Sequence, residues 1–163
     1  MTEKEMFLQT WEREFQTTLK VLKAYPPDKL DLRPHERSRS ARELAWQFVV
    51  EESIINGIIT GQIKINFQNA PKPPATLPEI LSAYEKTHNE MVGKVKALPE
   101  AEFNKSITFP VGPKQMGDVR RGDILGRLLM DCVHHRGQFS VYLRMAGGKV
   151  PSIYGPSADE PWM

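Results

Sequence analysis

Four stretches of about twenty residues place apolar side chains every three or four positions, the spacing of an amphipathic α-helix. We predict helices over residues 3–24, 41–60, 78–98 and 122–146. Prolines in the first two connections cannot donate the backbone hydrogen bond that would continue a helix. None of the four stretches is apolar on every side, a pattern typical of helices packed around a shared core. The predicted fold is therefore all-α, a four-helix bundle whose long connections permit crossovers.

Local signals also mark the ends of these helices. Ser40–Glu43 has the spacing of a capping box at the start of the second helix. Gly147–Gly148 suits the left-handed conformation that often follows a helix. In the connection after Pro99, Ser106–Phe109 is expected to form a short extended segment. We expect the C-terminal tail, 149–163, to pack across the bundle or against a second subunit.

Length and charge restrict the class of protein. The 163 residues suit one domain, 1–163, with a sizeable core. A net charge of +2, with charges spread along the chain, lacks the basic patch of a nucleic-acid-binding protein. No apolar run reaches the roughly 20 residues that span a bilayer, and the charged start, Met1–Met6, is unlike a signal peptide. We therefore expect a cytoplasmic protein with no nucleic-acid or membrane partner.

A histidine interrupts the apolar seam of the last predicted helix. The seam consists of Leu125, Leu128, Cys132, His135, Phe139, Tyr142 and Ala146. Asp131 lies one turn before His135, so both side chains can point at one spot. A buried imidazole beside a carboxylate is typical of a metal ligand, a proton-transfer group or a structural hydrogen bond, and these residues alone do not choose among the three. We interpret Cys132 as a small buried hydrophobic residue and not as a nucleophile.

Two other predicted helices carry polar side chains on their inward stripes. Gln47 and Glu51 lie one turn apart on the second helix, and Tyr84 and His88 lie one turn apart on the third. Side chains from facing helices of a bundle can converge into one metal site. We interpret His88 as a core histidine satisfied by one or two hydrogen bonds. Glu51 either faces the same site or is solvated at the edge of its helix.

Several pieces of the sequence resemble the DinB family of bacterial four-helix proteins. They are Trp11–Glu14, Ser38–Trp46, His134–Gln138, Ser140–Arg144 and Val150–Gly155. The similarity extends over nearly the whole chain. The resemblance implies a bundle, often a homodimer, in which three histidines hold one divalent metal ion. One of these histidines comes from the second helix, and two lie four residues apart on the last. The resemblance also implies relatives that transfer or isomerise groups with low-molecular-weight thiols.

The match to this implied ligand set is incomplete. His135 is present, but the position one turn earlier is Asp131 and the second-helix position is Gln47. Asp131 offers an oxygen ligand, whereas a glutamine amide binds zinc or nickel weakly. The predicted metal ligands are therefore His135, Asp131 and Gln47, with Glu51 or His88 as substitutes. The resemblance implies one zinc, nickel, manganese or iron ion, together with a low-molecular-weight thiol.

Two hypotheses follow from these residues and the resemblance. In the first, the protein is a metal-dependent hydrolase or thiol S-transferase-like enzyme with an altered ligand set, and the ion acts as a Lewis acid or lowers the pKa of bound water or thiol. In the second, it is a metal-free relative that binds a small molecule or serves as a dimeric interaction module. Asp131 and Gln47 would then hold His135 by hydrogen bonds, leaving the imidazole a proton-transfer role. The two missing imidazoles favour an altered or absent metal site slightly over a working site.

Overall fold

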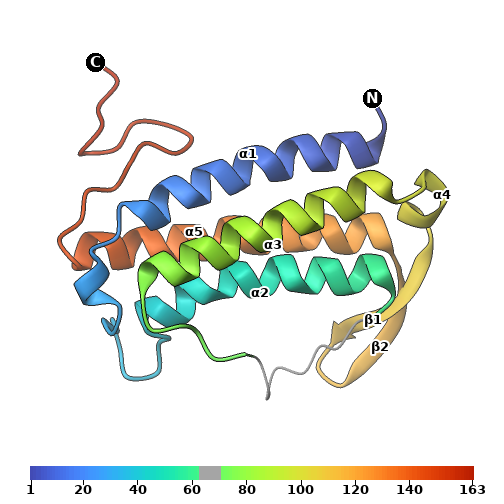
Figure 1. Cartoon of the computed structure of the whole chain (residues 1–163), viewed down its shortest axis with the longest axis horizontal. Helices are drawn as coiled ribbons and strands as arrows, with labels where there is room; N and C mark the ends of the chain where they lie inside the picture. The colour runs from blue at the N-terminus through green and yellow to red at the C-terminus, as the bar shows by residue number, and fades with distance from the viewer. Residues whose placement is uncertain (63–70) are drawn as a thin grey trace.

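The computed structural model describes residues 1–62 and 71–163. Four long helices form a bundle, as predicted (Figure 1): α1 (Glu3–Lys23), α2 (Ala41–Thr60), α3 (Leu77–Ala97) and α5 (Arg121–Met145). The predicted bounds of these helices are correct to within one residue. Two short elements, the 3-10 turn η1 (Pro27–Lys29) and the helix α4 (Glu100–Phe103), lie in the connections. Among the helices described here, none combines the length and hydrophobicity needed to cross a membrane.

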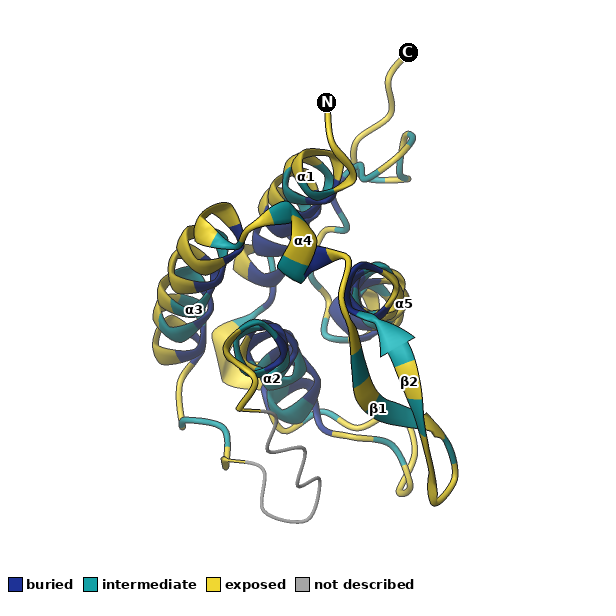
Figure 2. Ribbon diagram, turned by 90° about the vertical axis from the view of Figure 1, so that its right-hand side faces the viewer, coloured by how far each residue is buried: buried dark blue, intermediate teal, exposed yellow. Residues whose placement is uncertain are grey.

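The four long helices surround one core. α1 packs mainly against α3 and α5, and α2 packs mainly against the same two helices. Figure 2 views the bundle nearly end-on, with the buried residues turned inward. α1 and α5 run in one direction, and α2 and α3 run in the opposite direction (Figure 1). α2 ends and α3 begins at opposite ends of the bundle (Figure 1), so the topology includes a crossover. Half of the connection between them, residues 63–70, lies outside the described residues.

Side-chain caps set the starts of three long helices. In each case the hydroxyl before the helix accepts a hydrogen bond from the backbone three residues later, and a glutamate there returns the contact. The pairs are Thr2 with Glu5, Ser40 with Glu43, and Thr76 with Glu79. The predicted capping box at Ser40 is therefore confirmed. Gly147 follows α5 with φ of 83°, the left-handed conformation predicted for this position.

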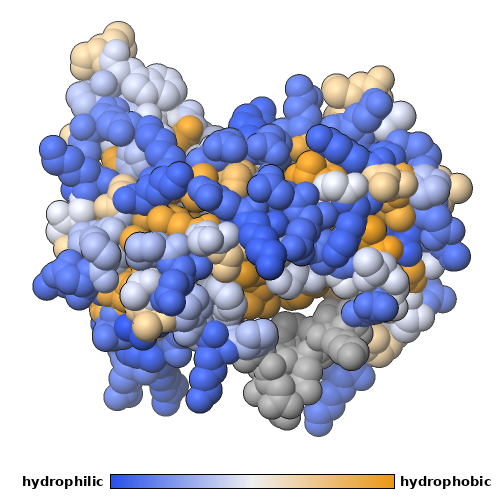
Figure 3. Space-filling model, in the orientation of Figure 1, coloured by the Kyte–Doolittle hydropathy of each residue, from blue (hydrophilic) through white to orange (hydrophobic). Residues whose placement is uncertain are grey.

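The core consists of aromatic and aliphatic side chains from all four long helices. Its largest fully buried members include Trp11, Phe48, Tyr84 and Phe139. Burying each such side chain contributes about 1.5–3 kcal/mol to folding. On the face seen in Figure 3, hydrophilic side chains cover most of α1 and α3, and hydrophobic ones show in smaller patches. The packing also brings α2 against α5, which together carry most of the predicted site residues.

The connection between α4 and α5 forms an antiparallel hairpin of β1 (Ser106–Gly112) and β2 (Gln115–Arg120). The predicted extended segment, Ser106–Phe109, lies in β1 and is confirmed. The second strand was not predicted, because its sequence contains a glycine and an aspartate, both unfavourable in strands. β2 leads directly into α5 and packs against it.

The C-terminal tail lies along the first helix. The Lys20 ammonium donates to the Glu160 carboxylate at 2.9 Å, and the Tyr154 hydroxyl donates to the Glu14 carboxylate. Lys20 and Glu14 both belong to α1. The tail therefore packs across the bundle, which is the first of the two predicted arrangements.

Candidate functional site

Three ionisable side chains from α2 and α5 meet at the interface of these helices. Nδ1 of His135 lies 2.6 Å from Oε1 of Glu51 and 3.8 Å from Oδ2 of Asp131. One ligand atom from each of the three residues lies within 4.8 Å of the other two. Over residues 1–62 and 71–163, no other group of three such side chains is close enough to hold a metal ion. The predicted pairing of His135 with Asp131 is thus joined by Glu51, one of the predicted substitutes.

Exposure increases steadily across this group. The side chain of Glu51 is 1% exposed, that of His135 is 12% exposed, and that of Asp131 is 48% exposed. Glu51 is buried because it falls on the stripe of α2 that also carries Phe48 and Ile55. The group therefore extends from the core to the surface, with a carboxylate at each end and the imidazole between them.

The pKa values of this group reflect its burial and its internal contacts. Burial raises the pKa of Glu51, and the hydrogen bond to His135 offsets only part of that effect. The same hydrogen bond raises the pKa of His135, against the opposing effect of burial. Within the described part of the chain, Oε2 of Glu51 has no hydrogen-bond partner. An unpaired buried acceptor costs about 1–3 kcal/mol, so a cation or a water bound there would stabilise the site.

Gln47, one of the predicted ligands, lies at the edge of this group. It is half-buried, one turn before Glu51 on α2. Its amide is close enough to lower the pKa of Glu51. Of the two polar residues on this stripe, Glu51 therefore makes the direct contact with His135. A role for Gln47 as a metal ligand stays a prediction.

His88, the other predicted substitute, lies in a different cluster. Its Nδ1 is 3.0 Å from Oε1 of Glu52, and its Nε2 is 2.9 Å from Oε2 of Glu12. The ring stacks on Phe15, with ring centroids 3.6 Å apart. The Trp11 indole also donates to Oε1 of Glu52, at 2.8 Å. The interpretation of His88 as a core histidine satisfied by hydrogen bonds is confirmed.

Sequence reasoning missed a third buried ionic cluster, between α1 and α5. Arg136 is 1% exposed, and its guanidinium lies 2.7 Å from Oε2 of Glu14. The Tyr154 hydroxyl contacts both of these residues. A signal was present, because Glu14 continues the apolar spacing of Trp11 and lies three residues after it. The cluster ties the tail to the bundle.

Cys132 is buried between these clusters. The side chain is 3% exposed, and burial strongly raises the pKa of its thiol. A thiol is nucleophilic only as the thiolate, so this environment makes Cys132 inert. The interpretation of Cys132 as a small buried residue is confirmed.

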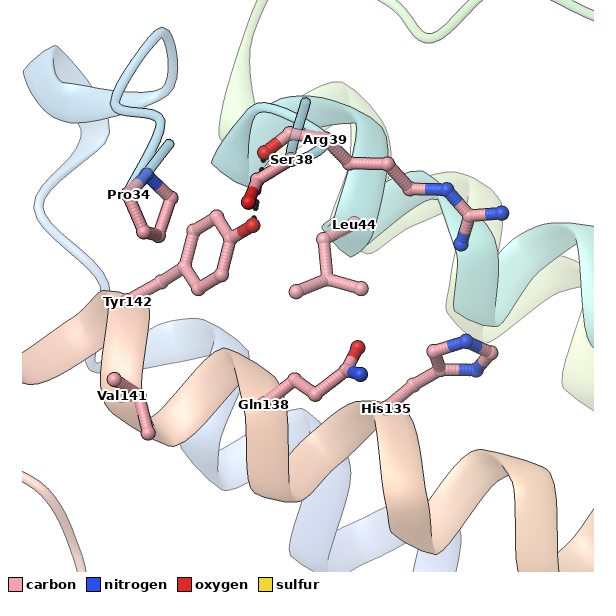
Figure 4. Close-up of a pocket in the computed structure, with 8 residues that line it drawn as sticks. All are labelled: Pro34, Ser38, Arg39, Leu44, His135, Gln138, Val141 and Tyr142. Atoms are coloured by element: carbon pink, nitrogen blue, oxygen red, sulfur yellow. Dashed lines mark hydrogen bonds between the residues drawn. The ribbon is translucent and has the colours of Figure 1, made fainter. Parts of the chain in front are cut away.

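His135 also borders an open cleft of about 550 Å³. Its lining, drawn in Figure 4, comprises Pro34, Ser38, Arg39, Leu44, His135, Gln138, Val141 and Tyr142. The Tyr142 hydroxyl donates to the backbone carbonyl of Arg39 at 2.9 Å, which links the last helix to the loop before α2. The volume lies in the range typical of small-molecule sites. The ionisable group and a cleft for a ligand are therefore adjacent.

Comparison with known proteins is consistent with this architecture. The profile of the DinB family matches residues 1–162. The uncharacterized protein YrdA of Bacillus subtilis (strain 168) is 31% identical over 159 residues, which cover 94% of this chain and 89% of YrdA. A crystal structure of a DinB-like protein from Bacillus cereus ATCC 10987 superposes with a TM-score of 0.74, at 25% identity, over 92% of this chain and 97% of that one. The DinB-like protein YjoA of Bacillus subtilis gives a TM-score of 0.72 at 17% identity, over 91% of this chain and 97% of YjoA, and supports the fold alone.

Proposed function

This chain belongs to the DinB family, and from that premise we propose that it binds one divalent metal ion through Glu51, Asp131 and His135 for a reaction on a small molecule. The observation that carries the proposal is the convergence of these three side chains beside the cleft. The reaction classes that the family resemblance implies are hydrolysis and thiol S-transfer.

The residues present fit a divalent ion. Two carboxylates and one imidazole form a donor set of oxygen and nitrogen, which suits zinc, manganese or iron. Catalytic metal sites commonly use three protein ligands and keep one position open for water or substrate. Oε2 of the buried Glu51 has no hydrogen-bond partner in the described chain, whereas Oε1 is bonded to His135. A cation beside Oε2 would offset the cost of burying this carboxylate.

Each of the three side chains has a distinct part in this proposal. A bound ion would supply Lewis acidity and lower the pKa of a coordinated water or thiol. Glu51 anchors the site from the core and orients the imidazole through their shared hydrogen bond. His135 connects the ion position to the cleft, because it belongs to both. Asp131, the most exposed of the three, would hold the ion from the solvent side.

Elemental mass spectrometry on untagged protein, purified without chelator, tests the proposal. We expect about one ion per chain in the unmodified protein and loss of that ion in His135→Ala and Glu51→Gln. His134→Ala is the matched control, because His134 is the exposed neighbour and its side-chain hydrogen bond within the described residues is to Gln138, not to a proposed ligand. Absence of metal after incubation with zinc, nickel, manganese or iron, or equal metal in His135→Ala, would contradict the proposal.

A second candidate function is favoured by one contact. His135 and Glu51 form a 2.6 Å hydrogen bond that raises the pKa of the imidazole. In a metal-free protein, this pair would transfer a proton to or from a ligand in the cleft. The two candidates differ in their response to a chelator. Thermal stability that stays constant on addition of chelator, with no metal found, supports the metal-free protein.

We also propose a homodimer and a cytoplasmic location, both from the family resemblance. Exposed apolar side chains on α5 at Met130 and Met145 would gain from being covered in a dimer. Sedimentation velocity checks this proposal, with a dimer expected for the unmodified protein and a shift toward monomer for Met145→Glu. A single monomeric species at all concentrations would contradict the homodimer.

A further inference from the structure

One arginine beside the candidate metal centre has no acidic partner. Arg39 lines the cleft, and its guanidinium makes no hydrogen bond or ion pair with any residue in the described ranges. Most other arginines of this part of the chain are paired with carboxylates, as Arg42 is with Asp31 and Arg120 is with Glu3. The positive charge of Arg39 is therefore available to a ligand.

Hydrogen bonds hold the backbone at Arg39 in place. The backbone carbonyl of Arg39 accepts the Tyr142 hydroxyl, and the preceding carbonyl, of Ser38, accepts from Arg33 at 2.6 Å. The next residue, Ser40, caps α2 and is buried. In Figure 4 the guanidinium extends past Leu44 toward the end of the cleft that holds His135. It also opposes protonation of His135, which indicates that the two groups lie close together.

The charge of the whole site then favours a negative ligand. A divalent ion would balance the two carboxylates of Glu51 and Asp131, with His135 as a neutral ligand. The charge of Arg39, whose side chain is exposed at the open cleft, would remain unbalanced. A planar guanidinium binds carboxylate and phosphate oxygens through paired hydrogen bonds.

We propose that Arg39 binds the oxyanion group of an anionic substrate, a carboxylate or a phosphate, whose reacting end lies at His135. The apolar side chains of Leu44 and Val141 line the space between and would contact a short apolar body. A volume of about 550 Å³ is large enough for a small molecule. Because the site is the same, this substrate class rests on the proposed function.

Nuclear magnetic resonance titrations with three matched probes test the proposal. The probes are butyrate, butyl phosphate and the uncharged butyramide, followed through the ring signals of His135 in chelator-treated and zinc-loaded protein. We expect at least one anion to bind, more tightly with zinc, and butyramide to bind at least about tenfold more weakly. The stronger of the two anions identifies the oxyanion.

Two glutamine variants provide the decisive comparison. Arg39→Gln should weaken binding of the preferred anion about tenfold or more, since it removes the charged guanidinium and leaves a shorter, neutral polar side chain. Arg37→Gln is the matched control, because Arg37 is exposed on the same loop and does not line the cleft. Equal affinity in Arg39→Gln and the unmodified protein would overturn the proposal, as would failure of both anions to bind.

Metal analysis of the same samples separates this proposal from the proposed function. Stoichiometric zinc with no effect of Arg39→Gln overturns the substrate class alone. Absence of zinc, with anion binding that still depends on Arg39, overturns the metal centre and leaves the oxyanion site supported.

Discussion

Consecutive residues of α2, Glu51 and Glu52, form two buried glutamate–histidine pairs with different surroundings. Glu51 binds His135 on the side facing α5, and Glu52 binds His88 on the side facing α1 and α3. Both glutamates are almost fully buried, and within the described chain each keeps one oxygen without a hydrogen-bond partner. The pairs are thus alike in chemistry and in burial.

Their difference lies in what else each pair contacts. Both ring nitrogens of His88 are occupied, its ring stacks on Phe15, and the Trp11 indole binds the same glutamate. His135 instead reaches a second carboxylate, Asp131, and an open cleft. A buried glutamate–histidine pair is therefore not by itself evidence for a functional site. The Glu51–His135 pair is distinguished by its position beside a cleft, from which a further ligand can reach it.

The largest expected effect on stability comes from removing the glutamate of the enclosed Glu52–His88 pair. Glu52→Ala should lower the free energy of unfolding by about 3–5 kcal/mol, because it leaves Nε1 of Trp11 and Nδ1 of His88 buried without a hydrogen-bond partner. Glu51→Ala should cost about 1 kcal/mol or less in metal-free protein, since it also removes a carboxylate whose pKa is raised by burial. Urea unfolding in the presence of chelator measures both. Equal losses would show that the two pairs do not differ as described.

Adding a metal ligand beside the Glu51–His135 pair should have a smaller effect on free energy. Gln47→His adds the imidazole that the family resemblance implies, one turn from Glu51 on the same helix. We expect zinc affinity to rise about tenfold, or ~1.4 kcal/mol, by competition with a chromophoric chelator. Gln47→Ala is the companion variant. Weaker zinc binding by Gln47→Ala would show that the glutamine itself is a ligand, whereas unchanged binding would leave the three-residue set.

The smallest effect concerns pH. The hydrogen bond to Glu51 raises the pKa of His135, and hydrogen bonds to Glu52 and Glu12 outweigh burial and raise that of His88. Burial raises the pKa of Glu51 as well. A raised pKa stabilises the folded protein below the unfolded value, about 6.5 for histidine, and this contribution is lost as pH rises through the folded value.

Metal-free protein should therefore become less stable as the pH rises above about 6.5, measured by urea midpoints in chelator. Histidine-to-glutamine variants at 135 and 88 should each flatten part of this dependence. Zinc affinity should show the opposite trend, because protons compete with the ion for His135. A metal affinity that falls over the same pH range would count against His135 as a ligand.

The sequence predicted the helices well because their signals are local. Proline-containing connections, the Ser40–Glu43 cap and the three- and four-residue spacing all act within one or two turns. The partners of polar side chains are not local. Gln47 and Glu51 lie on the same stripe of α2, and only the rotation of that helix between α3 and α5 makes Glu51 the contact of His135. The pairing of His88 with Glu12 likewise depends on the packing of α3 against α1.

The adjacency of Glu51 and Glu52 also bears on how the ligands are preorganised. Successive side chains of a helix point about 100° apart, so contacts made by Glu52 fix the rotational register of α2 from the side remote from the cleft. Glu51 is consequently aimed at His135 before any ion arrives and loses little conformational entropy on binding one. Substitutions around Trp11 or His88 would then misalign a ligand that they never touch. The packing of the core around Glu52 therefore determines how accurately Glu51 is positioned in the site.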